Sequence, residues 1–136
     1  MGLVGDLGDQ GADVIRVDPP GGPRWDTPAN ATWNRNKRSI VLDLKLAEAR
    51  DVLLRLVDTA DVFVHNIRPQ KLDKLGLGSE ALLKRNPRLV YGRMTGWGQD
   101  GPYAQAAGHD INYIALAGAL HYIGQKGQQP SPPLSL

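Results

Sequence analysis

Apolar residues occur along the chain in short runs that alternate with amphipathic segments. β-Branched and aliphatic residues dominate four of these runs, which predicts β-strands at 12–18, 39–44, 61–65 and 88–95. Apolar spacings of three and four predict helices at 47–59 and 110–123. A shorter helix is predicted at 79–86, where Ser79 caps the first turn and Pro87 prevents continuation.

The alternation of strands and helices indicates the fold class. We expect an α/β protein, part of an open, mostly parallel Rossmann-like sheet with flanking helices. Residues 24–34 are interpreted as an ordered loop and 96–102 as a glycine-rich loop. Helix 110–123 is expected to be buried, because apolar residues surround much of its circumference. A strand that starts near the N-terminus and an extended apolar tail at 132–136 suggest a segment of a larger protein, an incomplete large domain.

Composition narrows the function classes. The 136 residues include no cysteine, which excludes disulfides, thiolate metal sites and cysteine nucleophiles and fits a cytoplasmic location. The three histidines lack zinc-ligand spacing, so no metal site is expected. A net charge of +2 is too small to indicate nucleic-acid binding. No apolar run approaches the roughly 20 residues of a membrane-spanning helix, so no membrane partner is expected.

The positive charge is gathered in two clusters, and each allows two interpretations. The first comprises Arg35, Lys37 and Arg38, and the second comprises Arg68, Lys71 and Lys74. Either cluster could bind the phosphates of a small molecule, and either could be a solvated surface. Arg68 follows a predicted strand, where ligands of parallel sheets bind. The first cluster precedes its strand and so lies at the opposite end.

A second candidate feature is the pair His109 and Asp110 before the last predicted helix. A histidine there is a plausible general acid or base, because its unperturbed pKa lies near neutrality. The alternative is that Asp110 caps the helix and His109 is an ordinary polar neighbour. His65 and His121 are interpreted as structural, since one ends a strand and the other lies in the helix expected to be buried. Glycines at 96, 98, 101 and 108 would let the backbone approach a ligand.

Seven stretches in order along the chain resemble the family III CoA-transferases, which include carnitine and bile-acid CoA-transferases, formyl-CoA transferase and α-methylacyl-CoA racemase. The resemblance spans nearly the whole chain, and its motifs are specific only in combination. The stretches are Gly11–Val17, Asn34–Ile40, Arg68–Pro69, Leu75–Gly78, Asn86–Tyr91, Thr95–Gln99 and Gly108–Tyr113.

This resemblance implies a site for coenzyme A, bound as part of the substrate, with no tightly bound cofactor. Residues that match CoA-contacting positions of the family are Leu42, Asn66, Ile67, Arg68 and Lys74, and Gly108 is expected to join them. One departure concerns Pro19, because some members have an arginine at that place. The resemblance further implies that residues 1–136 form an incomplete CoA-binding large domain, without the second domain that completes an interlocked homodimer.

The resemblance also assigns the candidate catalytic residues, His109 and Asp110. In the racemase branch the matching histidine is one of two acid/base groups that flank the α-carbon of a thioester, and the other is an aspartate. In the transferase branch that aspartate is a nucleophile. It follows a stretch that here is Pro133–Leu136, where the chain ends. Racemisation of 2-methylacyl-CoA is therefore the leading hypothesis, and CoA transfer and an inactive CoA-binding fragment are the alternatives.

Overall fold

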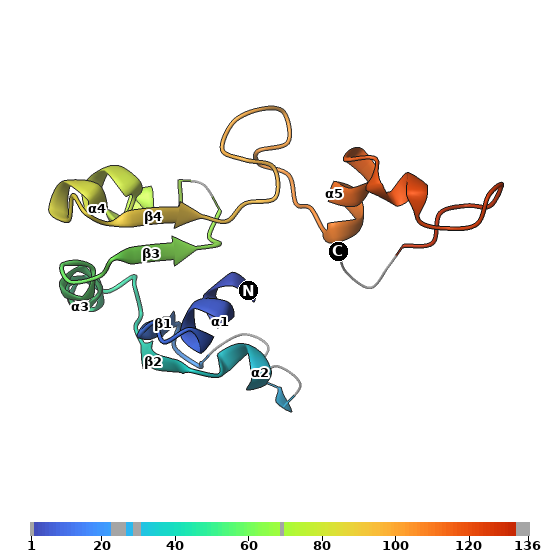
Figure 1. The fold of residues 1–136 in the computed structure, drawn as a ribbon. Coiled ribbons are helices and arrows are strands. Elements are labelled where there is room, and N and C mark those ends of the chain that lie inside the picture. The colour runs from blue at the N-terminus through green and yellow to red at the C-terminus, as the bar shows by residue number, and fades with distance from the viewer. Residues whose placement is uncertain (1, 23–26, 29–30, 69, 133–136) are drawn as a thin grey trace. The chain divides into compact units, whose positions relative to one another are not determined.

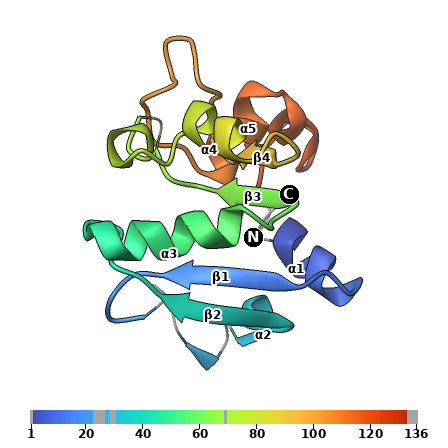
Figure 2. The same ribbon diagram turned by 90° about the vertical axis from the view of Figure 1, so that its left-hand side faces the viewer.

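The computed structural model describes residues 2–22, 27–28, 31–68 and 70–132. The chain divides into two compact units, Met1–Thr59 and Ala60–Leu136. Each unit combines helices with one pair of parallel strands (Figures 1 and 2). The predicted α/β class with parallel pairing and flanking helices is thus confirmed.

The first unit is built around strands β1 (Val14–Asp18) and β2 (Lys37–Val41). They run parallel, with Val14 opposite Lys37 and Asp18 opposite Val41. The Leu42 N–H donates to the Asp18 carbonyl at 2.9 Å and extends the pairing by one residue. The remaining elements of this unit are α1 (Gly2–Asp9), α2 (Ala31–Asn34) and α3 (Ala47–Val57). Leu53 and Val57 on α3 are buried, as the apolar spacing predicts.

Helices α1 and α2 were not predicted. Glycine has a low helix propensity, and this concealed α1 at the sequence level. Its Gly8 packs against the chain before β2, where an added Cβ would lie 3.2 Å from the Asn36 carbonyl oxygen. The interpretation of residues 24–34 as loop is wrong for α2, and residues 23–26 and 29–30 lie outside the described residues. Strand β2 starts before the predicted Ser39, because its pairing with β1 begins at Lys37.

The second unit contains a parallel strand pair with a helix in its connection. β3 (Val62–His65) runs parallel to β4 (Val90–Arg93), and between them come the 3-10 turn η2 (Asp73–Leu75) and helix α4 (Ser79–Arg85). Buried leucines of this connection form the core of the unit, namely Leu72, Leu77, Leu82 and Leu89. Gly78 occupies the cap position of α4, and Ser79 is its first helical residue, so the predicted serine cap is wrong.

The predicted helix 110–123 is two shorter elements. α5 (Asp110–Leu116) ends before Gly118, which has φ 80°, and the 3-10 turn η3 (Ala119–Tyr122) follows. A left-handed glycine ends the regular helix. The expected burial is also wrong, because Ile111 is 45% and Leu116 67% exposed, whereas Ile114 is buried. His121 is exposed, so it does not lie inside a buried helix.

None of the helices in the described parts of the chain is long and apolar enough to cross a membrane.

The core of the second unit yields a test with an adjacent control. Leu82 is fully buried, whereas Leu83 on the same helix is 38% exposed. Leu82→Ala is expected to lower the free energy of unfolding by about 2–5 kcal/mol, because it removes buried methyl groups and leaves a cavity. Leu83→Ala is expected to lower the free energy of unfolding clearly less. Urea unfolding of both variants measures the difference, and equal losses would contradict this description of the core.

Candidate functional site

The parallel pairing of β3 and β4 brings their carboxyl ends together. His65, the last residue of β3, lies opposite Arg93, the last residue of β4. The Met94 N–H donates to the His65 carbonyl at 2.8 Å and continues the pairing. The Asn66–Arg68 loop and the glycine-rich loop therefore leave the sheet side by side. This is the edge of a parallel sheet at which ligands bind.

A small hollow of about 10 Å³ opens at this edge. Most of the residues that line it are polar or charged, and the lining comprises His65, Arg68, Gln70, Leu72, Asp73, Tyr91, Arg93 and Gln99. A hollow of this size admits roughly one water molecule or one ligand oxygen atom. Arg68 was predicted as a site residue, whereas Tyr91, Arg93 and Gln99 were not.

His65 forms one side of the hollow and is held by its neighbours. Its Nδ1 accepts a hydrogen bond from the Ile67 N–H at 3.2 Å. Its ring packs edge-on against Tyr91, with centroids 5.4 Å apart. Burial lowers the pKa of His65, the positive charge of Arg93 lowers it further, and the negative charge of Asp73 acts in the opposite direction. The imidazole is therefore neutral at pH 7.

Arg93 links β4 to two other parts of the hollow. Its guanidinium donates to the Ser79 hydroxyl at the start of α4, and to Gln99 Oε1 in the glycine-rich loop at 3.3 Å. It also lies 5.4 Å from the centre of the Tyr91 ring, a cation–π arrangement. The Tyr91 hydroxyl donates to the Leu77 carbonyl at 3.1 Å, and burial raises the pKa of Tyr91. Tyr91 and Arg93 occupy alternate positions of β4. This alternation was the signal in the sequence from which both residues could have been predicted.

The residues predicted to contact CoA are distributed over both units. Asn66, Ile67 and Arg68 lie in the loop after β3, and Lys74 lies in η2 of the same unit. Arg68 and Lys74 are exposed and form no ion pair with other described residues. Leu42 directly follows β2 in the first unit. Their role in binding remains a prediction.

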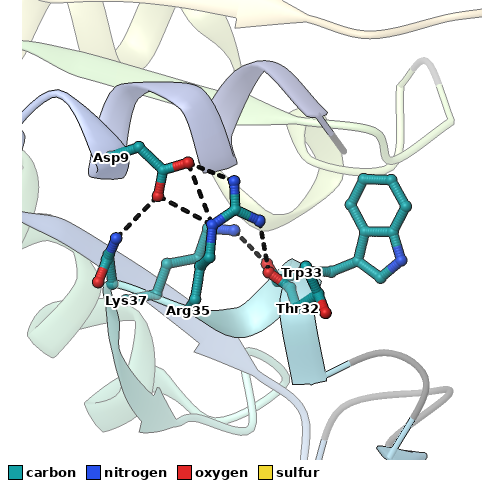
Figure 3. A network of polar contacts seen from close by, with 6 residues as sticks. Asp9, Thr32, Trp33, Arg35 and Lys37 are labelled. Carbon is teal, nitrogen blue, oxygen red and sulfur yellow. Dashed lines mark hydrogen bonds and ion pairs between the residues drawn. The ribbon is translucent and has the colours of Figure 1, made fainter.

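The three side chains of the first basic cluster bind acceptors within their own unit, and Figure 3 shows the contacts of Arg35 and Lys37. Arg35 forms an ion pair with Asp9 at the end of α1 and donates to the Thr32 carbonyl at 2.7 Å. This contact with Arg35 lowers the pKa of Asp9. The Lys37 ammonium donates to the Trp33 carbonyl. Arg38 forms a second ion pair, with Asp13 at 2.5 Å. These contacts favour the structural interpretation of this cluster over phosphate binding.

His109 stands at the start of α5, as predicted, but the cap is different. His109 itself occupies the N-cap position, and its N–H donates to Asn112 Oδ1 at 2.9 Å. Asp110 is the first helical residue, so its assignment as the cap is wrong. An asparagine three residues after the cap, as in a capping box, was the sequence signal for this bond. The His109 side chain is exposed.

An aromatic cluster fixes the chain on the N-terminal side of His109. The Trp97 ring lies 4.8 Å from Tyr113 on α5 and 5.3 Å from Tyr103. A Cβ added to Gly108 would lie 2.6 Å from the Tyr113 hydroxyl oxygen and 2.8 Å from Trp97 Nε1. The glycines Gly96 and Gly108 thus make room for Tyr113. Gly98 and Gly101 have positive φ and shape the turns of the loop.

No group of three or more histidine, aspartate or glutamate side chains among the described residues could hold a metal ion.

The environment of His65 yields a prediction for its ionisation. Because burial and Arg93 favour the neutral form, its pKa is expected below 6.5, with the proton on Nε2. Long-range proton–nitrogen NMR across pH 4–9 measures both properties. Because the pKa of His65 is lower in the folded chain, the unfolded chain binds the proton more readily. His65 therefore lowers the free energy of unfolding as the pH falls below 6.5. A proton on Nδ1 at pH 7.5 would contradict the hydrogen bond from Ile67.

The packing at Gly108 yields a second prediction. Gly108→Ala is expected to displace the Tyr113 and Trp97 rings and to lower the free energy of unfolding by about 1–3 kcal/mol, because the added methyl overpacks the site. Near-ultraviolet circular dichroism and thermal unfolding measure both effects. Ala107→Ser, at the adjacent exposed position, is the control. An unchanged aromatic spectrum for Gly108→Ala would contradict the described packing.

Comparison with known proteins adds a family and several relatives. The model of CoA-transferase family III matches residues 5–134. The human α-methylacyl-CoA racemase is 48% identical over 96% of this chain and 33% of its own length. The human succinyl-CoA:glutarate CoA-transferase is 37% identical over 93% of this chain and 32% of its own length. The chain thus spans about a third of these relatives.

Among solved structures, a CAIB/BAIF family protein from Brucella suis superposes with a TM-score of 0.86. It is 37% identical, and the match covers 96% of this chain and 39% of that one.

Proposed function

From the premise that this chain belongs to CoA-transferase family III, we propose that it acts on acyl-CoA thioesters and racemises 2-methylacyl groups at the α-carbon. One observation carries the choice of racemisation. His109 is an exposed imidazole whose backbone is fixed at the start of α5 by Asn112, in a chain 48% identical to the human α-methylacyl-CoA racemase. An exposed imidazole held in this way is suited to exchange protons with a bound substrate.

The proposed reaction moves one proton off and another onto the same carbon. His109 removes the α-proton from one face, and the electron pair of the broken C–H bond moves onto the thioester oxygen to give an enolate. A second acid on the other face then protonates the α-carbon, and the configuration inverts. For the reverse direction, a protonated His109 is the acid. We assign the second group to an aspartate.

Asp110 has a supporting place in this proposal. As the first residue of α5 it puts negative charge at the helix N-terminus beside His109.

Binding of the CoA part is supported by the second basic cluster. Arg68 and Lys74 are exposed cations without an ion-pair partner among the described residues, and they lie in the unit that also contains His109. An arginine can bind a phosphate bidentately, and a lysine can act as a point charge. Asn66, Ile67 and Gly108 complete the proposed contacts in this unit. A homodimer in which a second domain completes the site is part of this proposal.

CoA transfer is the second candidate, and a specific similarity favours it. The human succinyl-CoA:glutarate CoA-transferase is 37% identical over nearly the whole chain. In CoA transfer an aspartate would attack the thioester carbonyl and form an acyl anhydride with release of the CoA thiolate. The thiolate would then attack the aspartyl carbonyl of the anhydride, which gives an aspartyl thioester and releases the donor carboxylate. The acceptor carboxylate would repeat the two steps in reverse and leave with CoA. His109 would then bind substrate without exchanging an α-proton. The two candidates therefore differ in what they do to the α-hydrogen.

An isotope experiment separates the candidates. The complete natural protein, residues 1–136 with any flanking sequence its gene encodes, is incubated in D₂O with (2R)-2-methylacyl-CoA. Racemisation predicts deuterium at the α-carbon and formation of the 2S epimer without any acceptor acid. His109→Ala is expected to slow this exchange at least 100-fold, because it removes a general base. His121→Ala, which changes an exposed histidine of η3, is expected to retain activity.

The transferase arm uses the same protein with an added carboxylic acid acceptor. If CoA moves to the acceptor and no deuterium enters the acyl group, the result refutes racemisation and supports CoA transfer. Absence of both reactions would exclude both proposed activities.

A further inference from the structure

We propose that Asn112 is a positioning residue for His109: its side chain holds the backbone of the histidine and does not itself contact the substrate. The proposal rests on the proposed function, because it takes His109 to be the group that removes the α-proton. It deepens that function by adding a residue that the sequence left without a role in the reaction.

The first argument comes from the hydrogen bonds of the His109 backbone. Its N–H donates to Asn112 Oδ1 at 2.9 Å. Its carbonyl accepts from the Asn112 N–H at 2.9 Å and from the Tyr113 N–H at 3.3 Å. The N–H of a residue at the start of a helix has no acceptor in the helix backbone, so the Asn112 side chain is the group that fixes it. Two of these three bonds therefore depend on residue 112, and one of the two can be removed by changing its side chain.

The second argument concerns the chain on the other side of His109. The rings of Trp97 and Tyr113 enclose Gly108, because a Cβ added there would lie 2.7 Å from Tyr113 Cε1 and 2.8 Å from Trp97 Nε1. Tyr113 thus contacts Gly108 through its ring and is bonded to the His109 carbonyl through its N–H. His109 is therefore held between a packed glycine and a side-chain cap. The cap is the part of this arrangement that a substitution can remove without disturbing the packing.

The third argument is the exposure of both side chains. The His109 imidazole is exposed in the described part of the chain, so its placement there follows from its backbone and not from packing around the ring. A displacement of about 1 Å near a reaction centre can lower a rate about 100-fold. Asn112 is exposed as well, so its replacement leaves no cavity in the core. Loss of the cap is therefore expected to affect proton removal more than folding or substrate binding.

Three variants of the complete natural protein separate positioning from other roles. Asn112→Leu is close in size to the wild type and lacks the acceptor, whereas Asn112→Asp keeps an acceptor oxygen at the same place. Ala115→Gly, at an exposed position of α5, is the matched control, because glycine weakens the helix and leaves the cap intact. Deuterium exchange at the α-carbon of 2-methylacyl-CoA, followed across pH 6–9, measures kcat and KM. Thermal unfolding measures the stability of each variant.

We expect Asn112→Leu to lower kcat about tenfold and to change KM by less than about twofold, since the interaction serves the proton transfer alone. Asn112→Asp is expected to stay within about threefold of wild type at its optimum pH. Ala115→Gly is expected to keep the wild-type rate while its melting temperature falls. When His109→Ala is already present, Asn112→Leu is expected to have no further effect, because Asn112 acts only through the histidine.

An unchanged kcat in Asn112→Leu would overturn the proposal, and so would an equal loss in Ala115→Gly, which would identify a general effect of helix stability. A raised KM that persists beside His109→Ala would also overturn it, because Asn112 would then contact the substrate.

Failure of the wild-type protein to exchange the α-proton would refute the proposed function instead. The cap is then tested by the order parameter of the His109 amide, measured by nitrogen-15 relaxation. A lower value in Asn112→Leu than in wild type and Asn112→Asp supports the cap, and equal values in all three overturn it.

Discussion

The parallel register of β3 and β4 is the constraint on which the site in the second unit depends. It sets Phe63 opposite Tyr91 and His65 opposite Arg93. Side chains alternate between the faces of a strand, so these four residues share one face. The Phe63 and Tyr91 rings are in contact, with their centroids 5.2 Å apart. A shift of the register by one residue would turn His65 and Arg93 to opposite faces and would dissolve the hollow.

The sequence predicted the strands and the main helices, and it could not predict this register. Runs such as Val62–Phe63–Val64 identify a strand by local composition, whereas the partner of His65 depends on which residue of β4 lies beside it. The pairing spans 28 positions, and no local pattern encodes it. For the same reason Arg93 and Gln99 were missed, although Arg68 was found. His109 was located by motif, but its cap was misassigned, because Asp110 and Asn112 both have side chains suited to capping.

The two basic clusters show how similar sequence patterns acquire different roles. Arg35 and Arg38 lie 26 and 25 positions from their carboxylates, Asp9 and Asp13. The folding of α1 and β1 brings these charges together, and α1 itself was not predicted. Exposed ion pairs of this kind contribute little stability, so their main consequence is to occupy the cations. Arg68 has no such carboxylate among the described residues and keeps its charge available for an anion.

The glycine-rich loop connects the hollow at the ends of β3 and β4 to the surroundings of His109. Gln99 is bonded to Arg93 at the hollow, whereas Trp97 packs against Tyr113 on α5, the helix that His109 begins. The Cα atoms of residues 97 and 99 are at most about 7 Å apart, since each peptide step spans 3.8 Å. Between them Gly98 turns the chain with φ 83°, a conformation that few other residues adopt. A single short turn therefore connects the two groups.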